Sequence, residues 1–419
     1  MLRARPAAVL ADLCGPKIRT GPAPEQGVRL AAGTLVTLVP GDAPSAPERV
    51  SVSYSRLARE VRPGQRILLA DGRMELEAEG RRGGALLARV RVGGVLKSRK
   101  GVNLPGADLS VPALTRKDER DLSAVARAKP DYVALSFVRS AEDLLRCRRA
   151  MDERGLRSCG LIAKIETPEA VSRIGSILEA CDGIMVARGD LGVEMPQEEL
   201  PAIQRRLVDL ADRKDRICIV ATEMLESMVQ NPRPTRAEVS DVAAAVRDGA
   251  DAVMLSAETS VGRYPVAAVE AMARIVAAAE QSLLASGELS PQASSAAEGG
   301  PADLLALAAH RVCDGLPRAC LAVATETGRS ALFVSKSRPG CPILALSPSP
   351  AAVARMALYW GVRPVLCRPH RRHLSLLREA EAAAKRCLKA RRGGPLVVLS
   401  GTPLGRSGTL NTLQIRKIA

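Results

Sequence analysis

The sequence is poor in aromatic residues, with one Trp, four Tyr and two Phe among 419 residues. Many nucleic-acid-binding proteins stack bases on aromatic side chains, and the chain also has no helix-turn-helix or zinc-finger pattern. The formal net charge is nevertheless +16, because 61 Lys and Arg residues outnumber 45 Asp and Glu residues. The basic residues are spread along the whole chain, so we expect small phosphorylated molecules rather than nucleic acid as partners.

Paired cysteines and long apolar runs are also absent. The ten cysteines form no C-x-x-C pair, which argues against a disulfide framework and a zinc site and fits a reducing compartment. No apolar run approaches the ~18 residues of a membrane-spanning helix, and the apolar part of the initial MLRARPAAVL is too short for a signal peptide. We expect a cytoplasmic protein without a membrane partner.

Short apolar runs alternate with amphipathic segments between about residues 130 and 284. The runs are DYVALSF, GLIAKIE, GIMVARGD, RICIVAT and DAVMLSAE, and each is typical of a strand buried on both faces. Helix starts lie between them at Ser140, at Thr167 followed by Pro168, and at Thr235. Such repeated units predict a parallel sheet, either a (β/α)8 barrel or a doubly wound sheet.

Polar side chains follow the carboxyl ends of these strands, where both architectures place their chemistry. They are Ser136, Lys164 with Glu166, Arg188 with Asp190, Thr222, and Ser256 with Glu258. Ser136 and Ser256 are equally typical of helix caps, whereas buried charges need partners. The pattern predicts one polar site at one end of a barrel.

The chain divides into segments of different composition. Residues 1–14 contain a first barrel strand that ends at Asp12, and residues 15–112 have the pattern of a small all-β domain. Barrel units resume over residues 113–284. A Ser/Gly/Ala-rich linker covers 285–302, and residues 303–419 alternate apolar runs with helices. We therefore expect an α/β barrel with an inserted β lid domain and a C-terminal α/β domain.

The chemistry of the strand ends centres on one lysine and two carboxylates. Lys164 and Glu166 are two residues apart, so they project to the same side of a strand, and Asp190 ends the next strand. Carboxylates without a neighbouring His or thiolate suit Mg²⁺ or Mn²⁺. A lysine beside such a cation can hold a phosphoryl or enolate oxygen, so the residue types indicate metal-assisted phosphoryl or enolate chemistry. The GDLG segment after the strand is expected to form a turn.

Several longer motifs carry a resemblance to one family. They are ADLCGPKIRTG, SRKGVNLPG, LIAKIETPEAV, CDGIMVARGDLGVEMP, ATEMLESM and NPRPTRAEVSDVA, and together they closely resemble pyruvate kinase. The resemblance covers nearly all of the chain. It implies transfer of a phosphoryl group from phosphoenolpyruvate to ADP, giving ATP and pyruvate, by a homotetramer with an allosteric C-terminal domain.

The resemblance also implies roles for individual residues. They are Lys164 and Thr222 in catalysis; Glu166 and Asp190 on Mg²⁺ or Mn²⁺; Ser136, Arg188, Gly189, Asp190 and Thr222 on the substrate; Arg19 and Lys100 on the nucleotide; and Thr325, Thr327 and Ser330 on a sugar-phosphate effector. An ordinary turn from strand to helix explains the last three equally well. Asp12 matches a monovalent-cation site, but Leu13 and Lys17 replace the Thr and Glu of potassium-dependent members, so K⁺ is expected to be unnecessary.

A second departure concerns the barrel. The sequence offers six candidate barrel strands, fewer than a (β/α)8 barrel contains, and it lacks the Asn-x-Ser-His-Gly motif of the family. We therefore expect a chain without the first part of the barrel, with exposed sheet edges and uncertain catalytic competence. Two alternatives stay open: a non-catalytic relative that oligomerises or senses metabolites, and other metal-dependent enolate chemistry such as oxaloacetate decarboxylation.

Overall fold

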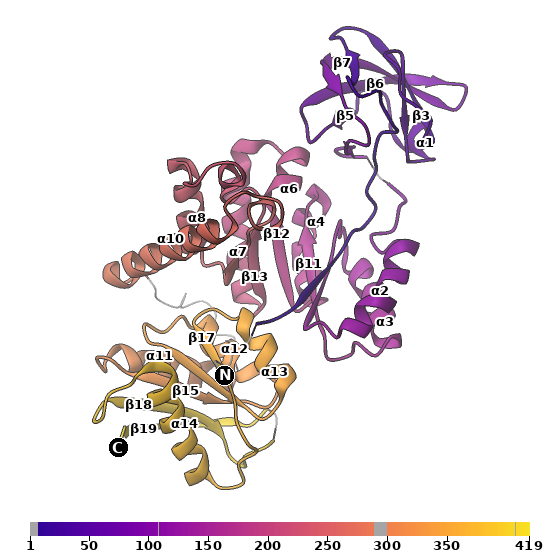
Figure 1. Cartoon of the computed structure of the whole chain (residues 1–419). Helices are drawn as coiled ribbons and strands as arrows, with labels where there is room; N and C mark the ends of the chain where they lie inside the picture. The colour runs from indigo at the N-terminus through magenta and orange to yellow at the C-terminus, as the bar shows by residue number, and fades with distance from the viewer. Residues whose placement is uncertain (1–6, 108, 289–299, 407) are drawn as a thin grey trace.

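The computed structural model describes residues 7–107, 109–288, 300–406 and 408–419. Figure 1 shows three bodies in a row: an all-β lid, a central sheet flanked by helices, and a C-terminal α/β body. The α/β fold with an inserted lid and a C-terminal α/β domain is thereby confirmed. The linker predicted over 285–302 lies largely outside the described residues.

The central body is a curled sheet of six parallel strands. In sheet order they are β1 (Leu10–Leu13), β10 (Tyr132–Leu135), β11 (Gly160–Ile165), β12 (Gly183–Ala187), β13 (Ile217–Ala221) and β14 (Ala252–Val253). These match the six predicted barrel strands, although β14 has only two residues. The apolar side chains of the four middle strands are buried on both faces, which explains the continuous apolar runs, whereas the edge strands β1 and β14 are mostly only partly buried.

Helices and 3-10 turns follow the strands and cover one face of the sheet. They are α2 (Arg116–Ala128), α3 (Ala141–Glu153), α4 (Pro168–Ser172), α5 (Ile174–Glu179), α6 (Arg188–Glu194), η1 (Gln197–Glu199), α7 (Leu200–Arg213), η2 (Glu226–Val229), α8 (Arg236–Asp248), α9 (Ala257–Ser260) and α10 (Pro265–Ser286). The predicted starts at Ser140, Thr167 and Thr235 are confirmed as N-caps. At Thr235 the hydroxyl accepts from the Glu238 N–H at 3.2 Å, and the Glu238 carboxylate accepts from the Thr235 N–H at 2.7 Å. The turn expected at GDLG is wrong, because these residues belong to helix α6.

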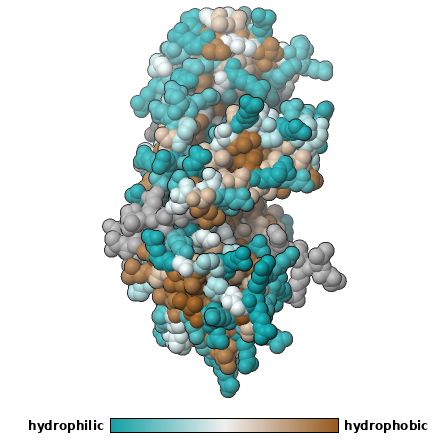
Figure 2. Space-filling model, turned by 90° about the vertical axis from the view of Figure 1, so that its left-hand side faces the viewer, coloured by the Kyte–Doolittle hydropathy of each residue, from teal (hydrophilic) through white to brown (hydrophobic). Residues whose placement is uncertain are grey.

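The lid is inserted between β1 and α2. It contains β2 (Val28–Leu30), β3 (Leu35–Pro40), β4 (Arg49–Val52), α1 (Leu57–Glu60), β5 (Arg66–Leu69), β6 (Met74–Arg82), β7 (Ala85–Val92), β8 (Gly94–Leu96) and β9 (Val102–Asn103). Six of these strands form one sheet in the order β4-β3-β7-β6-β5-β9, and β2 pairs with β8. The lid has its own apolar core, and its surface is largely hydrophilic at the top of Figure 2.

The C-terminal body is a five-stranded sheet between helices. Its elements are α11 (Pro301–Asp314), β15 (Cys320–Ala324), α12 (Arg329–Lys336), β16 (Ile343–Ser347), α13 (Pro350–Arg355), η3 (Met356–Leu358), β17 (Val362–Leu366), α14 (His373–Leu388), β18 (Pro395–Gly401) and β19 (Leu410–Lys417). The order is β17-β16-β15-β18-β19, with β19 antiparallel to β18. The four predicted strands are present, and β19 is an addition that the sequence analysis did not anticipate.

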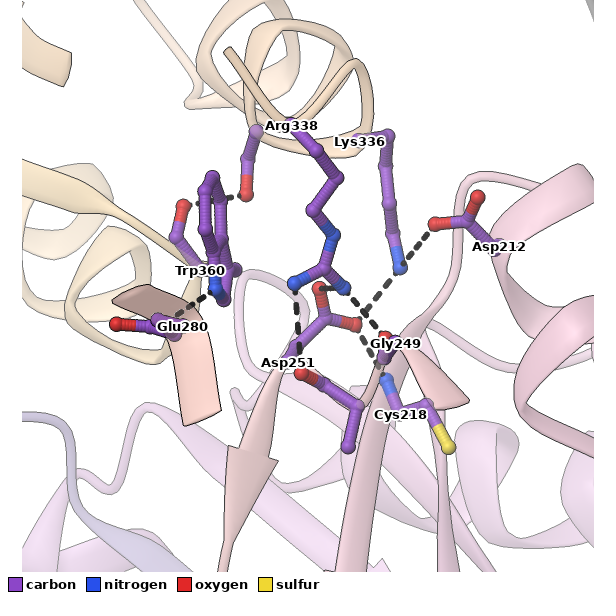
Figure 3. A network of polar contacts seen from close by, with 10 residues as sticks. Asp212, Cys218, Gly249, Asp251, Glu280, Lys336, Arg338 and Trp360 are labelled. Carbon is purple, nitrogen blue, oxygen red and sulfur yellow. Dashed lines mark hydrogen bonds and ion pairs between the residues drawn. The ribbon is translucent and has the colours of Figure 1, made fainter. Parts of the chain in front are cut away.

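The C-terminal body packs against the amino ends of the central strands. Tyr359 packs on the apolar inner face of that sheet, and the Tyr132 hydroxyl donates to the Arg355 carbonyl at 3.0 Å. Beside this contact, the Asp251 carboxylate lies 2.7 Å from the Lys336 ammonium and 3.1 Å from the Arg338 guanidinium (Figure 3). The contacts join residues from two bodies, so they fix how the C-terminal body sits under the sheet.

Two further properties bear on the function classes. No helix among the described residues is both long and apolar enough to span a membrane. The ten cysteines are free thiols, and burial raises the pKa of Cys147 and of Cys159 to about 12.

Candidate active site

Lys164 is the centre of a polar cluster at the carboxyl ends of β1, β10 and β11. Its ammonium lies 3.0 Å from a Glu166 oxygen, 3.1 Å from an Asp12 oxygen and 2.9 Å from the Ser136 hydroxyl. The three neighbouring strands run parallel, so residues at their ends meet at one edge. The structure therefore brings together four residues that the sequence placed at strand ends.

Glu166 is almost wholly enclosed in this cluster. Its side chain is 1% exposed, and its second oxygen accepts the Phe137 N–H at 2.7 Å. Burial raises the pKa of Glu166; the Lys164 ammonium opposes this shift, and the Asp190 charge adds to it. For Lys164, burial alone would lower the pKa, but Glu166 and Asp12 outweigh burial and raise it. Lys164 therefore stays positively charged, and its single charge does not balance the negative charges of all the neighbouring carboxylates.

Asp190 completes the acidic side of the site from the first turn of α6. Burial raises its pKa, while the ammonium groups of Lys164 and Lys17 lower it. Among the described residues, its carboxylate takes part in no hydrogen bond and no salt bridge. A buried carboxylate without a bonded partner is unfavourable unless a cation or a donor from a ligand joins it.

The donor set fits a hard divalent cation. Asp12, Glu166 and Asp190 face the Lys164 ammonium; burial is the main cause that raises the pKa values of Glu166 and Asp190, and the charges of neighbouring carboxylates add to it. Carboxylate oxygens are the ligands that Mg²⁺ and Mn²⁺ prefer, usually with water and substrate oxygens beside them. In the part of the chain that the structure describes, no group of three or more Asp, Glu, His or Cys side chains is arranged so that it could hold a metal ion by itself. The geometry suits a cation that shares its ligands with a substrate.

Thr222 follows β13 in a strained turn beside this cluster. Thr222 and Glu223 have φ of 67° and 54°, which is the left-handed region that β-branched residues such as Thr rarely adopt. A residue held there costs on the order of 1–3 kcal/mol, so the surrounding contacts must enforce it. The Thr222 hydroxyl accepts the Gly189 N–H at 2.7 Å and donates to the Ala221 carbonyl at 2.6 Å.

Arg188 reaches across from the end of β12 to this turn. Its guanidinium donates to the Glu223 carbonyl at 2.7 Å and to the Thr222 carbonyl at 3.4 Å, and it lies 3.2 Å from the Asp241 carboxylate on α8. Glu258, another predicted strand-end residue, is separate from the Lys164 cluster. Its oxygens accept the backbone N–H groups of Leu225 and Ser256, so Glu258 fixes local backbone.

A pocket of about 380 Å³ lies between the lid and the sheet. The lid side supplies Lys17, Arg19 and Lys100, and the sheet side supplies Asp190. A backbone bridge between Arg19 and Gly101 brings the segments of Arg19 and Lys100 together. The pocket thus places several cations opposite the carboxylates, as binding of an anionic ligand together with a metal ion requires.

Two contacts between the lid and the sheet were missed from the sequence. Arg139 follows β10 and donates to the carbonyls of Leu109 and Val111, where the chain returns from the lid. Asn103 of β9 donates to the Glu194 carboxylate of α6 at 3.0 Å, and burial raises the pKa of Glu194 to about 7. Asn103 and Glu194 both lie within the quoted motifs, but nothing in the sequence pairs them.

A larger pocket of about 730 Å³ lies in the C-terminal body. Its lining includes Thr325, Thr327 and Ser330, the residues predicted to bind an effector, together with Arg368 and Arg406. The Thr325 hydroxyl accepts the Gly328 N–H at 3.0 Å, which closes the loop before α12. The structure therefore gathers the three predicted residues around one cavity, far along the chain from Lys164.

Comparison with known proteins shows which family shares these features. A family model described as pyruvate kinase, barrel domain, matches residues 2–269, and one described as pyruvate kinase, alpha/beta domain, matches residues 303–416. A pyruvate kinase of Corynebacterium efficiens is 40% identical over 98% of this chain and 85% of its own length. Pyruvate kinases of Geobacillus stearothermophilus and Mycobacterium tuberculosis are 40% and 38% identical over 99% of this chain, and over 71% and 86% of their own lengths. These matches run along nearly the whole chain and give no support to the doubt about its catalytic competence.

Proposed function

The chain belongs to the pyruvate kinase family, and we propose that the Lys164 cluster under the lid is the centre that carries the family's reaction in this protein. The function is phosphoryl transfer from phosphoenolpyruvate to ADP, which yields pyruvate and ATP. The observation that carries the proposal is the buried Lys164 ammonium among carboxylates at the strand ends, beside a cation-lined pocket.

Glu166 and Asp190 are the proposed ligands of Mg²⁺ or Mn²⁺. Their burial, which raises both pKa values, supports this assignment, because a bound divalent cation would favour both ionised carboxylates. When bound, such a cation neutralises charge on phosphate and enolate oxygens. Glu166 is held for this role by the Phe137 N–H, which fixes one of its oxygens.

Lys164 is proposed to stabilise the phosphoryl group during transfer. Its ammonium contacts Asp12, Glu166 and Ser136 and keeps its charge, so it is a positioned cation at the site where negative charge moves. Phosphoryl transfer depends mainly on positioning and electrostatic stabilisation, and both are supplied here by a side chain buried at a strand end.

The substrate carboxylate is proposed to bind near Gly189, Asp190 and Thr222, with Ser136 and Arg188 close by. The Gly189 N–H donates to the Thr222 hydroxyl, and the Thr222 hydroxyl donates to the Ala221 carbonyl. A substrate carboxylate could replace the hydroxyl as the acceptor of the Gly189 N–H. Thr222 would then be available close to the carbon atom of the enolate that is protonated.

ADP is proposed to bind under the lid through Arg19 and Lys100. Both residues line the pocket with Lys17, and their charge is complementary to phosphate groups. We also propose that K⁺ is dispensable, because Lys17 brings an ammonium group to the pocket and its charge acts on Asp190. Asp12 is then paired with Lys164 instead of serving a monovalent cation.

The remaining proposals concern regulation and organisation. A sugar phosphate is proposed to bind at Thr325, Thr327 and Ser330, whose cavity also contains arginines, and the assembly is proposed to be a homotetramer. The domain boundaries are proposed as 1–14, 15–112, 113–284, 285–302 and 303–419.

The test is a coupled assay of pyruvate formation from phosphoenolpyruvate and ADP. We expect turnover with Mg²⁺ or Mn²⁺, none with a chelator, and no stimulation by KCl over a matched tetramethylammonium salt. Asp190→Asn should abolish both turnover and the rise in melting temperature that Mn²⁺ produces. A folded protein without turnover would contradict the enzymatic proposal, and effector-dependent stabilisation of that inactive protein would favour a sensing role.

A further inference from the structure

Arg188 makes contacts that differ from those of a residue that binds substrate directly. Its side chain is 13% exposed, and its donors are directed to two carbonyl oxygens and to Asp241. The two carbonyls belong to Thr222 and Glu223, the consecutive residues with positive φ. One guanidinium therefore holds both residues of a backbone turn that would not adopt this conformation by preference.

The turn controls where the Thr222 hydroxyl lies. Thr222 has a stiff β-branched side chain, so the position of its hydroxyl follows the backbone φ and ψ closely. In the left-handed conformation the hydroxyl meets the Gly189 N–H at 2.7 Å and joins the ends of β12 and β13. If the turn relaxed to a common backbone conformation, this hydroxyl would leave the Gly189 amide.

Arg188 is well suited to this task because it is anchored at both ends. Its backbone is the first residue of α6, directly next to Gly189, and Asp241 on α8 holds the outer side of its guanidinium. A planar guanidinium can donate in several directions at once, whereas a lysine ammonium cannot reproduce this fork. The contacts thus connect β12, β13 and α8 through one side chain.

We propose that Arg188 is a positioning residue that acts through Thr222. By holding the carbonyls of Thr222 and Glu223, it keeps the Thr222 hydroxyl at the Gly189 amide and in reach of the substrate. The inference rests on the proposed function only in assigning Thr222 a part in the reaction. The predicted direct contact of Arg188 with substrate is not needed for it.

The first test is a double-mutant cycle on the turnover number. Arg188→Lys should lower kcat by about 10- to 100-fold, as changes in residues that support a catalytic group commonly do, with a smaller effect on KM for phosphoenolpyruvate. In a Thr222→Ala background the same substitution should change kcat by less than about twofold, because the hydroxyl that it positions is gone. An equal loss in both backgrounds, or unchanged kcat in Arg188→Lys, would overturn the proposal.

The second test is hydrogen exchange, which does not depend on turnover. Arg188→Lys should speed exchange of the Gly189 amide and of the amides of 222–225, and Asp241→Asn should do so to a smaller extent. Arg206→Lys on the exposed face of α7 is the matched control, because Arg206 makes no hydrogen bond or ion pair within the described ranges. Unchanged exchange in both variants overturns the proposal even if the wild-type protein makes pyruvate. If the wild-type protein shows no turnover but exchange is still faster in Arg188→Lys than in the wild type, the result supports the role of Arg188 in holding the turn. It then contradicts only the proposed function.

Discussion

Two clusters of buried charge lie at opposite ends of the same parallel sheet. At the carboxyl ends, the Lys164 ammonium faces Asp12 and Glu166, and Asp190 lies nearby with no bonded partner among the described residues. At the amino ends, Lys336 and Arg338 share the Asp251 carboxylate, and Asp212 lies 3.4 Å from Lys336 (Figure 3).

The cluster at the carboxyl ends is called the upper cluster here, and the cluster at the amino ends is called the lower cluster. The two differ in how completely their charges are matched. The lower cluster has two cations and two carboxylates, and Asp251 also accepts the Cys218 N–H at 2.8 Å and is 1% exposed. The upper cluster has an excess of carboxylate, and its lid side is open to a pocket. The salt bridges of the lower cluster join two bodies and stabilise their contact, whereas the upper cluster has an excess of carboxylate beside a pocket and is suited to bind a cation and its ligand.

The same substitution made in each cluster gives the largest contrast. Lys164→Met should lower kcat for pyruvate formation by about 10³-fold or more, because it removes the cation that faces the transferred group. Lys336→Met should leave kcat per folded molecule within about twofold of the wild type, since the lower cluster touches no substrate. Steady-state assays at temperatures where circular dichroism shows both variants to be folded provide the measurement. A Lys164→Met enzyme that keeps a tenth of its activity would contradict the distinction.

Removal of the central carboxylate of the lower cluster should act on stability instead. Asp251→Ala leaves the buried charges of Lys336 and Arg338 without their shared partner, so we expect a loss of about 3–5 kcal/mol in the free energy of unfolding. Denaturant unfolding monitored by circular dichroism provides the value. The matched control is Asp241→Ala, whose carboxylate is 54% exposed and should cost less than about 1 kcal/mol. Equal losses in the two variants would show that burial does not set the difference.

Glu194 allows the upper end to be tested by pH. Burial raises its pKa from 4.5 to about 7, so the folded protein disfavours the charged form that the unfolded chain adopts above about pH 4.5. The contribution of Glu194 to stability therefore falls as pH rises from about 4.5 to 7 and stays low above that range. Glu194→Gln carries no charge, keeps an acceptor for Asn103, and should be more stable than the wild type by about 1–2 kcal/mol at alkaline pH.

The measurement for Glu194 is the difference in melting temperature between Glu194→Gln and the wild type at about pH 5 and about pH 8. The difference should grow with pH. A constant difference would mean that Glu194 titrates near its ordinary value, and the contact with Asn103 would then be an ordinary exposed hydrogen bond.

The smallest predicted effect belongs to Trp360 at the edge of the lower cluster. The Arg338 guanidinium lies 4.8 Å from the centre of its ring, and the indole N–H donates to Glu280 at 2.7 Å. Trp360→Phe keeps a ring but removes this hydrogen bond, so a loss of about 0.5–1.5 kcal/mol is expected. Thermal unfolding of Trp360→Phe beside Glu280→Ala, which removes the acceptor but keeps the indole ring, separates the ring from the bond. A loss as large as that of Asp251→Ala would show that the ring, rather than the carboxylate, is the centre of the contact.

The sequence predicted the upper cluster far better than the lower one. Lys164, Glu166 and Asp190 follow consecutive apolar runs, and parallel strands bring their carboxyl ends to one edge, so their proximity could be inferred. Lys336 and Asp251 are 85 residues apart and belong to different bodies, and no local pattern relates them. The position of one domain on another depends on surfaces that periodicity does not describe.

Local structure was also mispredicted where tertiary packing overrides propensity. GDLG contains Gly189 and Gly192, which disfavour a helix in isolation, but Leu191 is buried in the main core and α6 forms around it. Strand β19 has partly buried or exposed side chains at all but one position, so it lacked the strong apolar run of the four predicted strands. Arg139 was missed because its partners are backbone carbonyls, which leave no trace in a sequence.

The division of the pocket between two bodies sets how the reactants meet. Arg19 and Lys100 belong to the inserted lid, whereas Lys164 and Glu166 belong to the sheet, and the lid returns to the sheet through the segment that Arg139 holds. On the proposed function, donor and acceptor phosphates are thus held by separate bodies of the molecule. The gap between them is then set by the angle of the lid, so that a change at its hinge would alter the reaction distance without altering any residue that touches a phosphate.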